Sequence, residues 1–299
     1  MNAIFKKSRF ATAEQLADLA VQALLDEVNL TPKPALVDRR GSGAHDDLNL
    51  ELMEQSAHSL FSMFKAMAEA AELHGEVCQA LREDIGQLGR HGEKRMLQVT
   101  QGVNTHRGAI WSIGLVVTAA ALNIGNDESH FIQRVCTLAG EIASIEDRFI
   151  PKQTLSHGQL AHQKFGVSGA KEQAQQGFPV ILKFGLPQLV RSRNLRMTDT
   201  QANLNALLAM MTQLTDTCVI HRAGLDGLYE MQRGAQEVLD LGGCSTHQGQ
   251  QRFEQLEQRL LAMRASAGGA ADLLATLLFL DQAEQYNVKE LQGRYQWKY

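Results

Sequence analysis

Apolar residues recur every three to four positions along most of the chain, which is the period of an amphipathic helix. The first such stripe runs from Leu16 to Val28 and follows Thr12, whose spacing from Gln15 predicts a capping box. Alternating strand patterns bounded by turn residues are almost absent. The same period predicts further helices at Met53–Leu73, Glu76–Gly89, Arg107–Leu122, His130–Ile145, Thr200–Ile220, Leu225–Leu239, Gln250–Met263 and Ala271–Gln285.

Proline is scarce, and its distribution supports a helical fold. The 299 residues contain five prolines, and the stretches Ala35 to Ile150 and Gln188 to Tyr299 contain none. Because proline breaks helix interiors, long helical runs fit these stretches. No linker, repeat or low-complexity tract interrupts the chain. We therefore expect an all-α protein of ten or more helices, with a single compact domain over residues 12–299 and a frayed tail over residues 1–11.

Charge and hydropathy exclude several classes of function. Net charge is −4, from 29 Lys+Arg and 33 Asp+Glu. No run of basic residues supplies the clustered positive charge that nucleic-acid binding requires. The apolar stretches are shorter than the roughly 18 residues of a membrane span, and the N-terminus lacks a signal core. The four cysteines are widely spaced and fit thiols of a reducing compartment. We expect a cytoplasmic protein with neither a nucleic-acid nor a membrane partner.

Four connections between the predicted helices are rich in glycine and in polar side chains, which is typical of site loops. They are Thr31–Leu48, Gly102–Leu115, Ser156–Pro179 and Ala265–Ala275.

The first loop combines cations with carboxylates. Pro32 and Pro34 hold Lys33 in an extended conformation. Charged and titratable side chains follow, interleaved with glycine: Asp38, Arg39, Arg40, His45, Asp46 and Asp47. This mixture suits a polyphosphate held partly by Lys and Arg and partly through a divalent ion on Asp. A solvated loop with local ion pairs explains the composition equally well.

The second loop ends in four polar residues, Asn104 to Arg107, directly before an apolar helix that begins near Gly108. Free amide groups and the helix dipole make such a start an anion site. Asn104 or Thr105 is also expected to cap the helix, and capping does not exclude binding.

The third loop contains Ser156–His157, which is weak support for a nucleophile, and we expect a structural or substrate-positioning role. The fourth places Gly268 and Gly269 before Asp272 at the start of a helix. There the carboxylate favours the helix dipole, and the small residues admit a ligand. Asp216 is predicted on an apolar helix face, where a carboxylate is costly unless it is paired or metal-bound.

Common nucleotide and metal motifs are missing, including the phosphate loop, GxGxxG after a strand, and HExxH. The dipeptide His45–Asp46 is that of the all-α HD phosphohydrolases, but their site needs an upstream histidine and none precedes His45. An HD-like nucleotide phosphohydrolase and a non-catalytic nucleotide- or CoA-binding helical module remain as alternatives.

Taken in order, the loops resemble the triphosphoribosyl-dephospho-CoA synthases over nearly the whole chain, from Leu24 to Leu280. The segment from Glu27 to His45 resembles the family signature, and GVNTHRG resembles the family's GVNTHKG, with Arg107 at the usual lysine. The later matches are the SHG tripeptide, Gly169–Pro179, Thr215–Thr217 and Gly268–Ala275. Three departures are mild: Ala35 for a common glycine, Ala267 for proline and Ala270 for serine.

The resemblance implies a transferase that joins ATP to 3′-dephospho-CoA, releases adenine and keeps the triphosphate on the transferred ribose. A separate transferase then attaches the product to the acyl-carrier subunit of malonate decarboxylase or citrate lyase. The run Arg39 to Gly43 is more like the malonate decarboxylase branch.

For this reaction we expect three groups of site residues. ATP and its triphosphate are expected on Lys33, Arg39, Asn104, Thr105, Arg107, Gly268 and Gly269. Mg²⁺ is expected on Asp38, Asp46 and Asp216. Catalysis is expected from Asp38, His45, Asp46, His106 and Asp216, with His106 giving a proton or a hydrogen bond to the departing adenine.

Overall fold

The computed structural model describes residues 11–123, 130–150 and 169–295. The SHG segment with Ser156 and His157, and nearly all of the predicted tail, lie outside the described residues. The described helices are α1 (Ala13–Asn29), α2 (Leu50–Ser59), α3 (Phe61–His74), α4 (Gln79–Val99), α5 (Arg107–Leu122), α6 (Phe131–Ser144), α8 (Ala170–Gln175), α9 (Leu186–Asn194), α10 (Asp199–Met211), α11 (Thr217–Asp240), α12 (His247–Ala262) and α13 (Gly268–Tyr295). A π-helical turn (Ile181–Gly185) and a 3-10 turn (Gly243–Ser245) complete them.

These elements confirm the all-α prediction, since the described ranges contain helices and no named strand. α5 begins and ends at the predicted residues. The capping box at α1 is also confirmed: the Gln15 amide donates to Thr12 Oγ1 at 3.2 Å, and the Thr12 amide donates to Gln15 Oε1 at 2.8 Å.

Three predicted helices are too short, since Glu76–Gly89, Leu225–Leu239 and Ala271–Gln285 fall wholly or mostly within the longer helices α4, α11 and α13. Two others are broken in the structure. The stripe Met53–Leu73 is divided at Leu60 into α2 and α3. The predicted helix Thr200–Ile220 ends at Met211, and a new helix starts after Asp216. Apolar periodicity continues across both breaks, so it could not reveal them.

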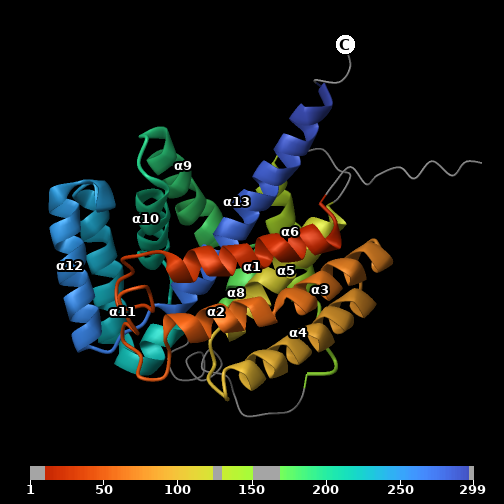
Figure 1. Ribbon diagram of the computed structural model, residues 1–299, viewed down its shortest axis with the longest axis horizontal. Helices are drawn as coiled ribbons and strands as arrows, with labels where there is room; N and C mark the ends of the chain where they lie inside the picture. Colours follow the sequence, from red (N-terminus) through yellow and green to blue (C-terminus); the bar gives the residue numbers. More distant parts are fainter. Residues whose placement is uncertain (1–10, 124–129, 151–168, 296–299) are drawn as a thin grey trace, which may run out of the picture.

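Helix α1 crosses the middle of the molecule and packs against α3 and α13, while α5 lies between α3 and α13 (Figure 1). α5 is buried almost all round, as its apolar sequence requires. α11 and α12 pack together at one side (Figure 1). None of the described helices has the length and hydrophobicity that a membrane span requires.

Candidate active site

The loop between α1 and α2 folds back on itself. The Ala44 amide donates to the Ala35 carbonyl at 2.9 Å. Gly43 has φ +58°, and a Cβ there would lie 2.5 Å from the same carbonyl oxygen. Ala35 also has a left-handed φ of +57°, which explains the common glycine of the resembling family at this position. The fold-back turns the first half of the loop inward.

Lys33 is buried at the inner side of this loop, with 2% of its surface exposed. Its Nζ donates to the Glu27 carbonyl at 2.7 Å and to Glu27 Oε1 at 2.5 Å. Glu27 is itself buried in the last turn of α1. This partner was missed from the sequence, because a charged residue near a helix end is normally solvated.

Asp38 organises the loop. Its buried carboxylate accepts the amides of Lys33 at 2.8 Å and Arg40 at 2.7 Å, and the Arg40 guanidinium at 2.7 and 2.9 Å. Burial acts to raise the pKa of Asp38, but the hydrogen bonds from Arg40 and Lys33 prevail and lower it. Arg40 also pairs with Glu257 of α12 at 2.5 Å. Asp38 therefore lies at the site as an ionised, fully engaged carboxylate.

His106 immediately precedes α5 and is 2% exposed. Its Nδ1 lies 2.7 Å from Ser56 Oγ, which is 2.6 Å from Thr105 Oγ1. Its Nε2 is buried and has no hydrogen-bond partner in the described part of the chain. Burial, then the charge of Lys33, lowers the pKa of His106 to about 3. The ring is neutral at physiological pH, so it can form a hydrogen bond but cannot act as a cationic acid.

The other polar residues of this loop lie further out. Asn104 Oδ1 accepts the Arg107 amide at 3.3 Å. The N-cap of α5 is His106, without a side-chain cap hydrogen bond, so the prediction that Asn104 or Thr105 is the cap is wrong. The half-exposed Arg107 guanidinium pairs with Glu93 of α4.

Asp216 is the N-cap of α11, not a residue inside a helix as predicted. Its Oδ1 accepts the amides of Cys218 at 2.9 Å and Val219 at 3.2 Å, and its Oδ2 accepts the Ala270 amide at 2.9 Å. A Cβ on Gly269 would lie 3.0 Å from Oδ2, so the glycine admits this contact. Burial raises the pKa of Asp216 although these amides oppose the shift. The carboxylate joins the first turns of α11 and α13.

Asp272, the fifth residue of α13, lies against the start of α5. A Cβ on Gly108 would come within 1.9 Å of its Oδ2, and Asp272 accepts the amide of Ala109. Burial, followed by the charges of Glu27 and Asp216, raises the pKa of Asp272 well above its ordinary value. Its interpretation as a dipole-stabilising residue missed this contact, which depends on tertiary packing.

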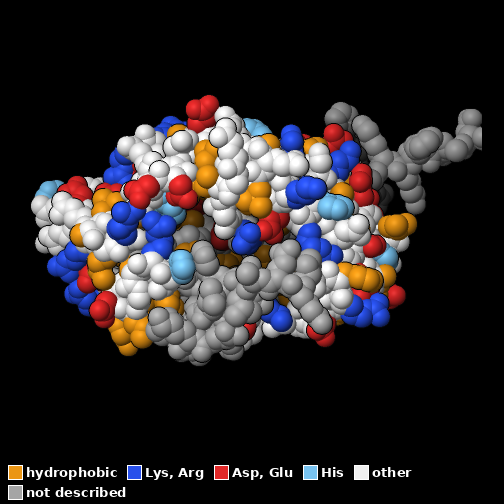
Figure 2. Space-filling view, turned by 90° about the horizontal axis from the view of Figure 1, so that it is seen from below, with side chains coloured by type: hydrophobic (Ala, Val, Ile, Leu, Met, Phe, Trp, Pro, Cys, Tyr) orange, Lys and Arg blue, Asp and Glu red, His pale blue; other side chains and the backbone are white. Residues whose placement is uncertain are grey.

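These contacts gather residues of three of the four predicted loops, together with Glu27 and Asp216, into one junction, formed by Glu27, Lys33, His106, Asp216 and Asp272. The positive N-terminal ends of α5, α11 and α13 meet at two of its carboxyl groups. From below, Lys, Arg, Asp, Glu and His side chains gather around a hollow near the middle of the molecule (Figure 2).

Besides Asn104 and Arg107, three predicted residues of the first loop make their contacts outside this junction. His45 Nε2 lies 2.7 Å from Ser266 Oγ, and burial together with the charge of Arg222 lowers the His45 pKa. Asp46 is exposed and pairs with Arg264. Arg39 is exposed and donates from Nε to Asn29 Oδ1 at 3.1 Å. They line the outer face of the first loop.

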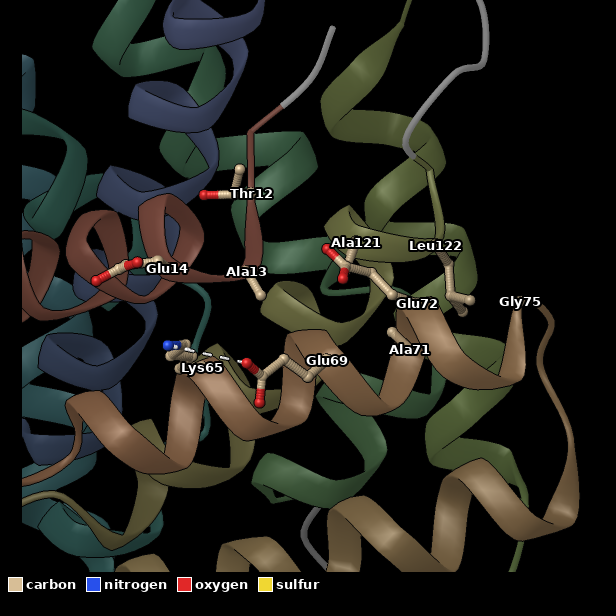
Figure 3. A pocket seen from close by; sticks show the side chains of 10 residues that line it. All are labelled: Thr12, Ala13, Glu14, Lys65, Glu69, Ala71, Glu72, Gly75, Ala121 and Leu122. Atoms are coloured by element: carbon tan, nitrogen blue, oxygen red, sulfur yellow. Dashed lines mark ion pairs between the residues drawn. The ribbon is translucent and has the colours of Figure 1, made fainter. Parts of the chain in front are cut away.

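A separate surface pocket of about 670 Å³ lies at the N-terminal end of α1, between α1, α3 and the end of α5 (Figure 3). Among the described residues that line it are Glu14, Glu69 and Glu72, with Lys65 as the one basic residue of that described lining. Three carboxylates against one ammonium group in this lining disfavour a triphosphate.

Comparison with known proteins gives a consistent result. Residues 13–291 match the family model of the ATP:dephospho-CoA triphosphoribosyl transferases. Relatives named probable 2-(5''-triphosphoribosyl)-3'-dephosphocoenzyme-A synthase occur in Stutzerimonas stutzeri (54% identical, covering 94% of this chain and 96% of the relative), Pseudomonas savastanoi pv. phaseolicola (57%, 91% and 92%) and Azotobacter vinelandii (55%, 92% and 94%). No solved structure matches the chain.

Proposed function

The chain belongs to the ATP:dephospho-CoA triphosphoribosyl transferase family and is a triphosphoribosyl-dephospho-CoA synthase. From this premise we propose that it transfers the triphosphoribosyl group of ATP to the 2′-hydroxyl of 3′-dephospho-CoA and releases adenine. The chemistry is glycosyl transfer at C1′ of ATP through a transition state of oxocarbenium character, as in glycoside hydrolysis.

The observation that supports this proposal best is the buried junction. Lys33 uses two of its three N–H donors on Glu27, and no described residue takes the third. Beside it, His106 Nε2 has no hydrogen-bond partner among the described residues, and helix N-termini point their positive ends inward. A buried cation and a buried polar atom without full hydrogen bonding are costly unless a polar ligand completes them.

The contacts at the junction suggest a separate role in substrate binding for each residue. Lys33 and the helix N-termini would hold phosphate oxygens, and Arg39 and Arg107 would extend this grip at the surface. Neutral His106 would give or accept a hydrogen bond at the purine. Asp38 would keep Lys33 and the inner half of the loop in place through its amide contact.

A requirement for Mg²⁺ remains a prediction. Asp38 and Asp216 already use their oxygens on Arg40 and on backbone amides, and Asp46 is paired on the surface. Within the described ranges, no three His, Cys, Asp or Glu side chains form a set that could hold a metal ion. The predicted trio does not fit as a ligand set, and Mg²⁺ would enter with the triphosphate of ATP.

We further propose a cytoplasmic role in making the prosthetic-group precursor of malonate decarboxylase, with citrate lyase as the other candidate. The basis is the run Arg39 to Gly43. The product would then pass to a separate transferase that modifies the acyl-carrier subunit.

One assay tests the reaction. The protein is incubated with ATP, Mg²⁺ and 3′-dephospho-CoA, and products are separated and weighed by mass spectrometry. We expect free adenine and one equivalent of a triphosphoribosyl adduct of dephospho-CoA. Phosphate or pyrophosphate without adenine would indicate an HD-like phosphohydrolase, and binding without turnover would indicate a non-catalytic module. An unchanged rate with a chelator would contradict the Mg²⁺ prediction.

A further inference from the structure

The proposed reaction needs a proton donor, because adenine leaves far more easily when a purine nitrogen is protonated as the bond to C1′ breaks. His106 was the expected donor. Its ring is neutral, however, and the N–H of a neutral imidazole is far too weak an acid for this purpose. The donor must be another group at the junction, and this inference rests on the proposed function.

The carboxyl groups at the site differ in the hydrogen bonds and ion pairs that they already make. Glu27 is neutralised by Lys33 at 2.5 Å. Asp38 is held by Arg40 and by the amide of Lys33. Asp216 is engaged by the first turns of two helices. Each of these groups would have to break existing contacts to serve a substrate.

Asp272 is different. Apart from the amide of Ala109, no described residue gives its carboxyl group a hydrogen bond or an ion pair. The residue as a whole is partly exposed. Gly108 brings it against the first turn of α5, the helix that His106 directly precedes in the chain. Asp272 is therefore the carboxyl group of the junction with free hydrogen-bonding capacity.

Charge also favours a proton on this group. With Glu27, Asp216 and Asp272 all ionised, three negative charges would share a poorly hydrated space with the single ammonium of Lys33. Like charges at short range in a buried site cannot all remain ionised at low cost. Glu27 and Asp216 have donors that stabilise their anions, whereas Asp272 has one amide, so the proton belongs on Asp272.

We propose that Asp272 is the general acid of the transfer. As the bond between C1′ and the purine breaks, its electron pair goes to the purine and the Asp272 proton moves to a purine nitrogen. The 2′-hydroxyl oxygen of dephospho-CoA forms the new bond to C1′ and loses its proton to water, from which Asp272 is reprotonated. One proton is taken up and one is released, so the reaction is balanced.

A change of leaving group tests this role. N7-methyl-ATP carries a positive charge on its purine, and its base departs without added protonation. We expect Asp272→Asn to lower the rate with ATP by about 10²-fold or more, the usual value of a general acid, while its rate with N7-methyl-ATP stays within about tenfold of wild type. Release of adenine or 7-methyladenine is measured in the presence of dephospho-CoA.

The controls make each outcome decisive. Asp226→Asn, an exposed carboxyl on α11, should match wild type with both substrates. The proposal is overturned if a folded Asp272→Asn protein loses its rate equally with ATP and with N7-methyl-ATP. It is also overturned if this variant keeps the wild-type rate with ATP. If circular dichroism shows that this variant is unfolded, the smaller Asp272→Ser variant is subjected to the same two tests. Absence of adenine release by wild type would instead contradict the proposed function.

Discussion

The two ends of α1 differ in a way that shows what marks a site. At its N-terminal end lies a pocket of about 670 Å³, whose described lining has three glutamates and one lysine (Figure 3). At its C-terminal end lies the junction around Lys33, where charges are buried and partly unsatisfied. The large hollow has the wrong charge for ATP, whereas the junction has donors that lack acceptors. Chemistry, not volume, identifies the candidate site.

Each end contains a Lys–Glu pair, and the pairs differ in their surroundings. Lys65 and Glu69 lie 3.9 Å apart, with 37% and 56% of their side chains exposed. Lys33 and Glu27 lie 2.5 Å apart, with 2% and 5% exposed. Water and salt screen the first pair, so it contributes little to stability. In the Lys33–Glu27 pair, removal of either side chain leaves the other as a buried charge without a partner.

The largest effect is expected from Lys33→Met. Removing the ammonium leaves Glu27 buried without a partner, so the free energy of unfolding should fall by about 3–5 kcal/mol. Urea denaturation followed by circular dichroism measures this change. The double variant Glu27→Gln/Lys33→Met should recover much of the loss, because no charge then remains unpaired. Equal losses of unfolding free energy in the single and double variants would show that Lys33 and Glu27 are not energetically coupled, contrary to this prediction.

The same substitution at the other end of α1 is the matched control. Lys65→Met removes an exposed ammonium, so the free energy of unfolding should change by less than about 0.5 kcal/mol. Adenine release should stay at the wild-type rate. A loss comparable to that of Lys33→Met would remove the contrast between the two ends.

A smaller loss of unfolding free energy is expected in the wild-type protein at acid pH, because the buried His106 ring stays neutral. Its folded-state pKa of about 3 lies below its ordinary value, so the unfolded chain binds the proton first as pH falls. The stability from the neutral ring is present above about pH 6.5 and is lost below it, by about 2 kcal/mol between pH 7 and pH 5.

Urea unfolding of wild type and His106→Asn at both pH values measures this loss. The difference between the two proteins should shrink by that amount at pH 5, while the contributions of Asp216 and Asp272 cancel. An unchanged difference would show that the ring is hydrated or charged in the folded protein.

Much of this structure could be predicted from sequence, for identifiable reasons. Helical periodicity and the scarcity of proline indicated the fold, and α5 was located to the residue because polar residues precede its apolar run. Asp216 was misplaced because the apolar period runs through the break before α11. Its position beside Thr215 and Thr217, in a segment without apolar side chains, was the available signal of a cap.

The partners within the site could not be predicted. Glu27, Ser56 and Asp272 lie on three different helices, and each is ordinary in its local sequence. Their roles arise from contacts across the fold, namely with Lys33, with His106 and with the start of α5. Propensity and spacing describe one element at a time, so they contain no information on which buried groups meet.

The most direct test asks where ATP binds. In protein labelled with ¹⁵N at histidine, the His106 signals can be assigned by their loss in His106→Asn, and ATP can then be added without dephospho-CoA. We predict that the His106 Nε2 resonance shifts on saturation, since ATP supplies the missing partner of that nitrogen. An unchanged His106 signal, together with shifts in the backbone amides of Thr12 and Gly75 at the other pocket in a second, uniformly ¹⁵N-labelled sample, would contradict the assignment of the site to the junction.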